Sequence, residues 1–168
     1  GNLELEEGEE GWGYFGLLGD SALIAHHYTS PMRSDRTTKP MLQRDALLVP
    51  QGQMEELGWD LFPLLALFPA PRALFRGDPL PDVGGFLAAR PLDEQLRAVD
   101  RWDLREIGDL LWLVLGPRRV DVDWGQPDVE LITAIFAILP PALRRRATFC
   151  TRTAAFDATR VKLAIGPS

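Results

Sequence analysis

The feature that most constrains the fold is a strand–helix–strand pattern in the last third of the chain. Residues 118–124 (RRVDVDW) alternate between polar and apolar side chains, which is typical of a strand with one buried face. Residues 128–139 (DVELITAIFAIL) are mostly apolar, as in a buried helix, and residues 147–153 (ATFCTRT) form a second strand pattern. A β-α-β unit has parallel strands joined by a crossover helix, so we expect parallel pairing in this part of the chain.

The N-terminal part predicts antiparallel strands instead. Two short aromatic and aliphatic runs are separated by Gly19-Asp20, and such a dipeptide between apolar runs is typical of a hairpin turn. The strand patterns outside the β-α-β unit cover residues 12–18, 21–29, 41–49 and 160–166. The sequence therefore predicts an α/β or α+β fold, with a mixed sheet of five or six strands and helices packed on it.

Two further segments have the apolar spacing of helices. Residues 53–68 repeat apolar side chains every three or four positions, and Pro63 marks a break or the start of a second helix. Residues 92–116 form one or two helices, with Asp103 as the cap of the last one. The expected buried stripe of that helix consists of Leu104, Ile107, Leu110, Leu111 and Val114. Residues 69–91, rich in proline and glycine, predict a long irregular connection.

Length and charge favour a single domain, residues 12–168, preceded by a flexible acidic extension, residues 1–11. The net charge is −6, and the extension contributes five glutamates to it, so the remainder is nearly neutral and has no general field that attracts nucleic acid. No apolar run approaches the length of a membrane span. The single cysteine excludes an internal disulfide and favours a reducing compartment, which predicts a cytoplasmic protein.

Residues 138–152 (ILPPALRRRATFCTR) contain the strongest candidate for a binding site. Arg144, Arg145 and Arg146 form either an anion-binding site or the end of helix 128–139, where cations complement the negative end of the helix dipole. We favour the structural interpretation, because a phosphate prefers the opposite end of a helix.

The polar loop 30–40 contains a second group of cations. Arg33, Arg36 and Lys39 outnumber the one acidic residue of this loop, Asp35. They could bind an acidic partner or a nucleotide phosphate by charge, and a solvated loop is the alternative that we favour.

Three aspartates support a catalytic alternative. Asp121 and Asp123 project from one face of strand 118–124, and Asp128 begins the helix that follows. Carboxylates near the carboxyl end of a strand and the start of a helix are where α/β folds place metal or substrate sites. We favour a strand whose polar face meets solvent, with Asp128 as a helix cap; the metal site is the alternative.

The remaining chemical groups predict no assembled centre. Cys150 alternates within its strand and is expected to pack as a small apolar side chain. The only histidines, His26 and His27, are adjacent strand residues whose side chains diverge, so we expect one to be buried and one exposed. No phosphate-binding loop occurs and residues 13–19 have the wrong spacing for a dinucleotide fingerprint, so no cofactor is expected.

Two stretches resemble bacterial GTPase-associated proteins of NTP-dependent conflict systems. Residues 21–69 (SALIAHHYTSPMRSDRTTKPMLQRDALLVPQGQMEELGWDLFPLLALFP) are similar to the strand, polar loop, strand, LLVP and helix succession of those proteins. Residues 134–151 (AIFAILPPALRRRATFCT) are similar to a stretch in which a helix ending in Leu-Pro precedes an arginine-containing turn and a Thr-Phe strand. The resemblance implies a non-enzymatic adaptor or sensor domain controlled by an NTPase, and it transfers no catalytic residue.

From these observations we expect a protein-interaction domain of a bacterial defence or signalling module, with an NTPase or an effector as its partner. Loops 30–40 and 69–91 are the expected contact surfaces. No nucleic-acid or membrane partner is expected. The alternatives are a hydrolase or nucleotide-processing enzyme that uses Asp121, Asp123 and Asp128, and a domain that forms homo-oligomers.

Overall fold

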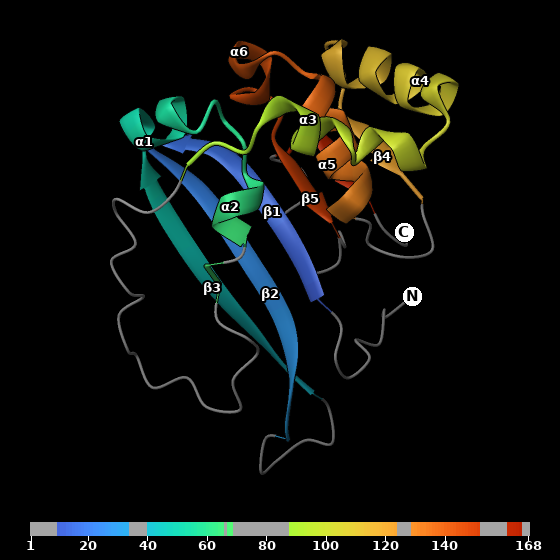
Figure 1. Cartoon of the computed structure of the whole chain (residues 1–168). Helices are drawn as coiled ribbons and strands as arrows, with labels where there is room; N and C mark the ends of the chain where they lie inside the picture. The colour runs from blue at the N-terminus through green and yellow to red at the C-terminus, as the bar shows by residue number, and fades with distance from the viewer. Residues whose placement is uncertain are drawn as a thin grey trace.

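A six-stranded mixed sheet carries helices on one face (Figure 1). The computed structural model describes residues 10–33, 40–65, 67–68, 88–123, 129–151 and 161–165. Its strands are β1 (Glu10–Leu18), β2 (Ser21–Arg33), β3 (Pro40–Pro50), β4 (Val120–Val122), β5 (Phe149–Thr151) and β6 (Leu163–Ile165), and their order in the sheet is β3-β2-β1-β5-β6-β4. The predicted mixed sheet with packed helices is confirmed.

The N-terminal strands pair antiparallel, as predicted, but they are longer than the sequence indicated. β2 and β3 extend into the predicted polar loop, and their pairing continues to Arg33 and Pro40. The register shifts between Ser30 and Arg33, next to Pro31. Because proline has no N–H to donate to the ladder, it is tolerated at such an irregularity. The result is a long hairpin that projects beyond the helices (Figure 1).

The C-terminal strands are parallel to one another, but the β-α-β unit is split. β4 and β5 each pair with β6 in parallel, and β6 lies between them. The helix that joins β4 and β5, α5 (Val129–Ile138), therefore skips one strand position. The sequence pattern predicted the parallel direction correctly; the insertion of the last strand depends on a pairing that no local pattern reveals.

The helices of the described residues are α1 (Gln51–Glu56), α2 (Phe62–Leu65), α3 (Leu92–Leu96), a 3₁₀ turn η1 (Val99–Arg101), α4 (Leu104–Leu115), α5 and α6 (Pro141–Arg144). Of these, α4 and α5 are long and the others are short. The predicted helix 53–68 is broken because Gly58 and Trp59 adopt left-handed φ angles of 57° and 58°. The Asp103 cap is confirmed, since its carboxylate accepts a hydrogen bond from the Arg105 N–H at 2.7 Å. Within the described ranges, none of these helices is long and apolar enough to cross a bilayer.

The core lies between the sheet and α5, with Tyr14 at its centre. The ring of this fully buried tyrosine contacts the rings of Trp59, Phe136 and Phe149. Its hydroxyl donates to the Arg145 carbonyl oxygen at 2.8 Å, which satisfies the one polar atom of the side chain. Burial raises the pKa of Tyr14 to about 12, so the phenol remains protonated at neutral pH.

The five apolar residues that were predicted to form the buried face of α4 are only partly buried. Ile107 and Val114 are buried, and Leu110 and Leu111 pack partly against the core. Leu104 is exposed instead. The apolar residues of this helix cover a wider part of its circumference than the core does. The prediction that Leu104 is buried was therefore wrong.

The opposite face of the sheet buries His27 against a glycine. Gly11 pairs with His27 in register, and a Cβ atom at Gly11 would lie 2.0 Å from the Cε1 atom of the histidine ring. The ring therefore lies across the backbone of β1, which only a residue without a side chain permits. Both histidines are buried, so the expectation that one would be exposed was wrong.

We predict that Gly11→Ala destabilises the fold, because the new methyl group must displace the buried ring of His27. The expected loss in the free energy of unfolding is about 1–3 kcal/mol, measured by urea denaturation. The matched control is Gly52→Ala, since a Cβ atom at Gly52 in helix α1 meets no atom within 4 Å in the part of the chain that the structure describes. A loss for Gly11→Ala no larger than that for Gly52→Ala would contradict the contact.

Candidate functional site

The arginine turn at the end of α5 uses its first member as a helix cap. All three side-chain nitrogens of Arg144 donate to backbone carbonyl oxygens: to Leu139 at 2.7 Å, to Ala137 at 3.1 Å and to Gly58 at 3.3 Å. Burial lowers the pKa of Arg144, opposed by the attraction of Asp60. This buried guanidinium thus satisfies the carboxyl end of α5 and ties it to the turn after α1, as the structural interpretation of the sequence expected.

The other two arginines of the turn point elsewhere. The Arg145 guanidinium lies 5.8 Å from the ring centre of Trp59, and its Nη2 atom is 3.4 Å from the Gln51 side-chain oxygen. Arg146 is exposed, and neither a hydrogen bond nor an ion pair joins its guanidinium to another residue in the ranges that the structure describes. The three cations therefore do not converge on one anion; Arg146 alone remains available to a ligand.

A partly buried ion pair that the sequence did not predict links the turn after α1 to the segment before α3. Arg90 donates from Nε and Nη2 to the two carboxylate oxygens of Asp60 at 2.7 and 2.8 Å. The Arg90 guanidinium also lies 4.5 Å from the ring centre of Phe62, and the Arg90 carbonyl oxygen accepts from the Gln95 side chain. No local pattern could reveal this pair, because its members are 30 residues apart in the sequence.

The aspartates of the catalytic alternative are only partly described. Asp121 lies in the edge strand β4, is exposed, and forms an ion pair with Arg119. Asp123 follows the strand and is also exposed, whereas Asp128 lies outside the described residues. Among the described residues, no group of three or more histidine, cysteine or acidic side chains could hold a metal ion. The metal site that requires all three aspartates stays a prediction.

The structure brings His26 close to an acid that the sequence analysis assigned to the flexible extension. The Nε2 atom of His26 lies 3.5 Å from Oε2 of Glu10, and its ring stacks on Trp12 with centres 3.9 Å apart. Phe68 and Tyr28 complete the aromatic surroundings of this buried ring. Burial lowers the pKa of His26, although the carboxylate of Glu10 opposes the shift. This contact arises because strand β1 begins at Glu10, two residues earlier than predicted.

Cys150 is not positioned as a nucleophile. It is fully buried, and burial raises the pKa of its thiol to about 11. His27 shares its sheet face, but β1 lies between their strands, so the backbones are roughly 10 Å apart. A buried, protonated thiol is a poor nucleophile, in agreement with the packing role predicted from the sequence.

The cations of the predicted contact loop are largely outside the described residues. Arg36 and Lys39 belong to residues 34–39, which the structure does not describe, and for Arg33 only the backbone at the end of β2 is described. Most of the second predicted contact loop, residues 69–87, is also outside the described residues. Binding by these segments stays a prediction.

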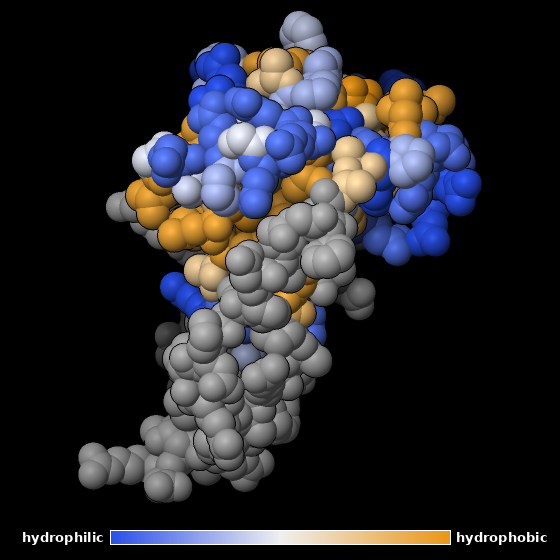
Figure 2. All heavy atoms as spheres, turned by 60° about the vertical axis from the view of Figure 1, so that its left-hand side comes forward, coloured by the Kyte–Doolittle hydropathy of each residue, from blue (hydrophilic) through white to orange (hydrophobic). Residues whose placement is uncertain are grey.

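An apolar line of residues on α4 is exposed to solvent. Leu104, Trp112 and Leu115 are 73%, 80% and 53% exposed, and Gly108 lies between the first two. Spacings of four, four and three residues align these four positions along one side of the helix. Figure 2 shows that apolar atoms also reach the surface in patches between hydrophilic ones. Isolated exposed apolar residues are ordinary, so the alignment is what distinguishes this α4 stripe.

We predict that Arg144→Met costs about 3 kcal/mol of stability, because it leaves carbonyl oxygens unsatisfied in the interior. The measurement is urea unfolding, with Arg145→Met as the matched control at a neighbouring exposed position. The control is expected to change the free energy of unfolding by less than about 1 kcal/mol. Equal losses for the two variants would show that Arg144 does not cap α5.

We also predict that the fold weakens between about pH 6.5 and pH 4 through His27. Burial, followed by repulsion from Arg44 and His26, lowers the pKa of His27 from its usual 6.5 to about 4. In this range the unfolded chain binds a proton that the folded chain excludes, so the stabilisation is complete above pH 6.5 and is lost as the pH falls.

The variant that tests this pH dependence is His27→Gln, which has no titrating side chain. The free energy of unfolding, measured by urea denaturation at several pH values, should fall less steeply with acidification in the variant than in the parent chain. Parallel pH profiles for the two proteins would show that His27 has a similar pKa in the folded and unfolded states.

Comparison of this chain with models of protein families, with curated proteins and with solved structures found no match. The resemblance of residues 21–69 and 134–151 to bacterial GTPase-associated proteins thus stays a prediction.

Proposed function

We propose that this chain is a non-enzymatic adaptor or sensor domain that binds a protein partner through the α4 stripe. The observation that carries the proposal is the exposure of Leu104, Trp112 and Leu115 along one side of a single helix. Aligned apolar groups in water are costly unless a partner covers them, and an exposed tryptophan is typical of the central residues of protein interfaces.

Gly108 supports this interpretation. Glycine in the interior of an exposed helix costs about 1 kcal/mol relative to alanine, yet a Cβ atom here would meet no atom of the described residues within 4 Å. Packing within the domain therefore does not require the glycine. A flat position between Leu104 and Trp112 lets the backbone of a second helix approach α4 closely, which gives the glycine a role in binding.

The charges of α4 favour a protein over a lipid surface. A helix that lies on a membrane usually has lysine and arginine along its polar face. In α4 the polar positions are Arg105, Glu106 and Asp109, which together are acidic. An apolar stripe beside a mildly acidic face matches a helix or groove of another protein.

For the class of partner we propose an NTPase or an effector of a bacterial defence or signalling module, in the cytoplasm. The support is the resemblance of residues 21–69 and 134–151 to GTPase-associated proteins, together with the single cysteine of the chain. The loops 30–40 and 69–91 remain proposed secondary contacts. Self-association through the α4 stripe is the competing explanation, and the experiment below distinguishes the two.

The test is photo-crosslinking in the cells of origin. A benzophenone amino acid replaces Trp112, and the control carries it at Glu56, an exposed residue of α1 far from α4 (Figure 1). We expect position 112 to capture one discrete protein, identified by mass spectrometry as an NTPase or an effector, and position 56 not to capture it. Crosslinks only to a second copy of the chain, or equal capture at both positions, would overturn the proposal.

We predict that two substitutions separate stability from binding. Gly108→Ala should raise the free energy of unfolding by about 1 kcal/mol and the melting temperature by roughly 2–4 °C, because alanine is the better helix former. It should nevertheless weaken capture at position 112, since the methyl group blocks close approach. Leu104→Ser should leave the stability within about 0.5 kcal/mol of the parent and also weaken capture. Unchanged capture by both variants would exclude the α4 stripe as the interface.

A further inference from the structure

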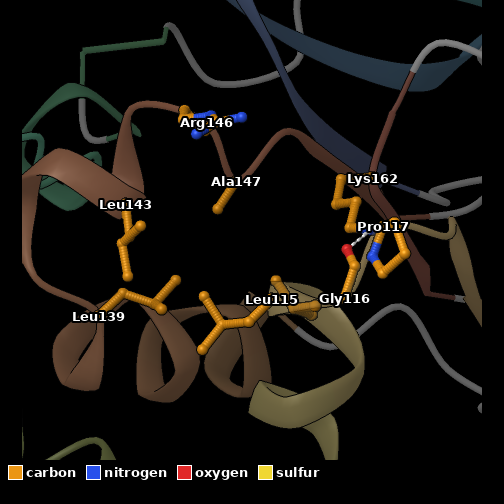
Figure 3. Close-up of a pocket in the computed structure, with 9 residues that line it drawn as sticks. Leu115, Gly116, Pro117, Leu139, Leu143, Arg146, Ala147 and Lys162 are labelled. Carbon is orange, nitrogen blue, oxygen red and sulfur yellow. Dashed lines mark hydrogen bonds between the residues drawn. The ribbon is translucent and has the colours of Figure 1, made fainter.

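A cavity of about 280 Å³ opens at the carboxyl end of α4. The last turn of α4, the end of α5 and the turn after α6 surround it, and Lys162 closes the side toward β6 (Figure 3). Its volume is slightly below the roughly 300–1,000 Å³ of typical small-molecule pockets. The space suits one large side chain of a partner better than a cofactor.

The cavity is apolar on one side, and it continues the α4 stripe. Leu139, which is buried, and Leu143, which is half-buried, line it together with Leu115. Leu115 is also the last residue of the α4 stripe, so the exposed apolar surface runs from the helix directly into the cavity. A partner that covers the stripe therefore reaches the cavity without a gap.

Two cations line the opposite side, and only one of them is available to a ligand. The Lys162 amine donates to the carbonyl oxygen of Gly116 (Figure 3) and to that of Arg118, so its charge balances the negative end of α4. Arg146 has no such partner within the described part of the chain. Its guanidinium has free donors at the rim of an apolar cavity, and a carboxylate can accept two of them at once.

The neighbouring helix ends determine which anion fits. α4 and α5 both end at this cavity, and neither presents its amino end, which is the helix end that a phosphate prefers. A single carboxylate needs only the Arg146 guanidinium, which can donate two hydrogen bonds to it. The surroundings therefore favour an acidic peptide segment over a phosphate.

We propose that this cavity receives an apolar side chain from an acidic segment of the partner, while Arg146 pairs with an adjacent aspartate or glutamate of that segment. The inference rests on the proposed function, since it specifies the chemistry of the partner that covers the α4 stripe. Apolar burial in the cavity supplies affinity, and the arginine–carboxylate pair selects acidic over neutral or basic segments.

The probe is a synthetic peptide, acetyl-Glu-Glu-Phe-Glu-Glu-amide, titrated into the full isotope-labelled chain at low salt and followed by amide chemical shifts. The matched peptides replace phenylalanine by serine, or all glutamates by lysine. We expect shifts at Leu115, Leu139 and Ala147 with the first peptide and much weaker binding of the other two. Equal binding of all three peptides, or shifts confined to other surfaces, would overturn the proposal.

The matched protein variants are Arg146→Glu and Arg145→Glu, two exposed neighbours of which only the first lines the cavity. Arg146→Glu should raise the Kd of the acidic peptide roughly tenfold or more, and Arg145→Glu should leave it nearly unchanged. Equal effects would show that only general charge matters. Inorganic phosphate that displaces the peptide and shifts the same amides would identify an anion site instead, and a dimer that Arg146→Glu dissociates would identify a second copy as the occupant.

The two proposals can fail separately. If the protein captured at position 112 binds the Arg146→Glu variant as tightly as the parent chain, the cavity inference fails and the adaptor function stands. If position 112 captures no partner but the acidic peptide still binds in the cavity with the expected selectivity, the α4 stripe fails as an interface, and of the inference only the preference of the cavity for an acidic segment with an apolar side chain stands.

Discussion

The packing of Tyr14 against the helical layer is the interaction on which the rest of the structure depends. Its ring joins residues from β5, α5 and the turn after α1, and its hydroxyl reaches the Arg145 carbonyl oxygen. One side chain thereby fixes the sheet, α5 and the arginine turn relative to one another. Because the site is fully buried, its single polar group must find an acceptor, and this requirement determines where the turn lies.

The arginines of the turn then divide between interior and surface. Arg144 points inward because the last carbonyl groups of α5 need donors. In the same layer, Arg90 donates to the buried carboxylate of Asp60. Arg146, two residues later, faces solvent beside a cavity. Three consecutive arginines thus differ in role because each faces a different part of the layer, so their spacing alone does not indicate a common ligand.

Parts of the fold and of the site could be predicted from local patterns. The hairpin turn at Gly19-Asp20 predicted the antiparallel strands, because a two-residue turn joins neighbouring strands, and the apolar run 128–139 predicted a buried helix. The cap at Asp103 followed from the preference of helix amides for a side-chain acceptor. The proposed interface was not predicted, since Leu104 has the same apolar character as the buried Ile107. No local sequence pattern indicates which side of an apolar helix the core will cover.

The sequence by itself determined the secondary-structure types, the antiparallel start, the parallel end and the absence of an internal disulfide, since these depend on residue type and near-neighbour spacing. Only the tertiary structure decided that β6 lies between β4 and β5, that His27 covers Gly11, and that Asp60 meets Arg90. Each of these contacts joins residues distant in the chain. The free energy of each contact depends on which surfaces remain uncovered once the sheet and α5 have packed together. It is therefore a property of the assembled core and not of any local stretch of sequence.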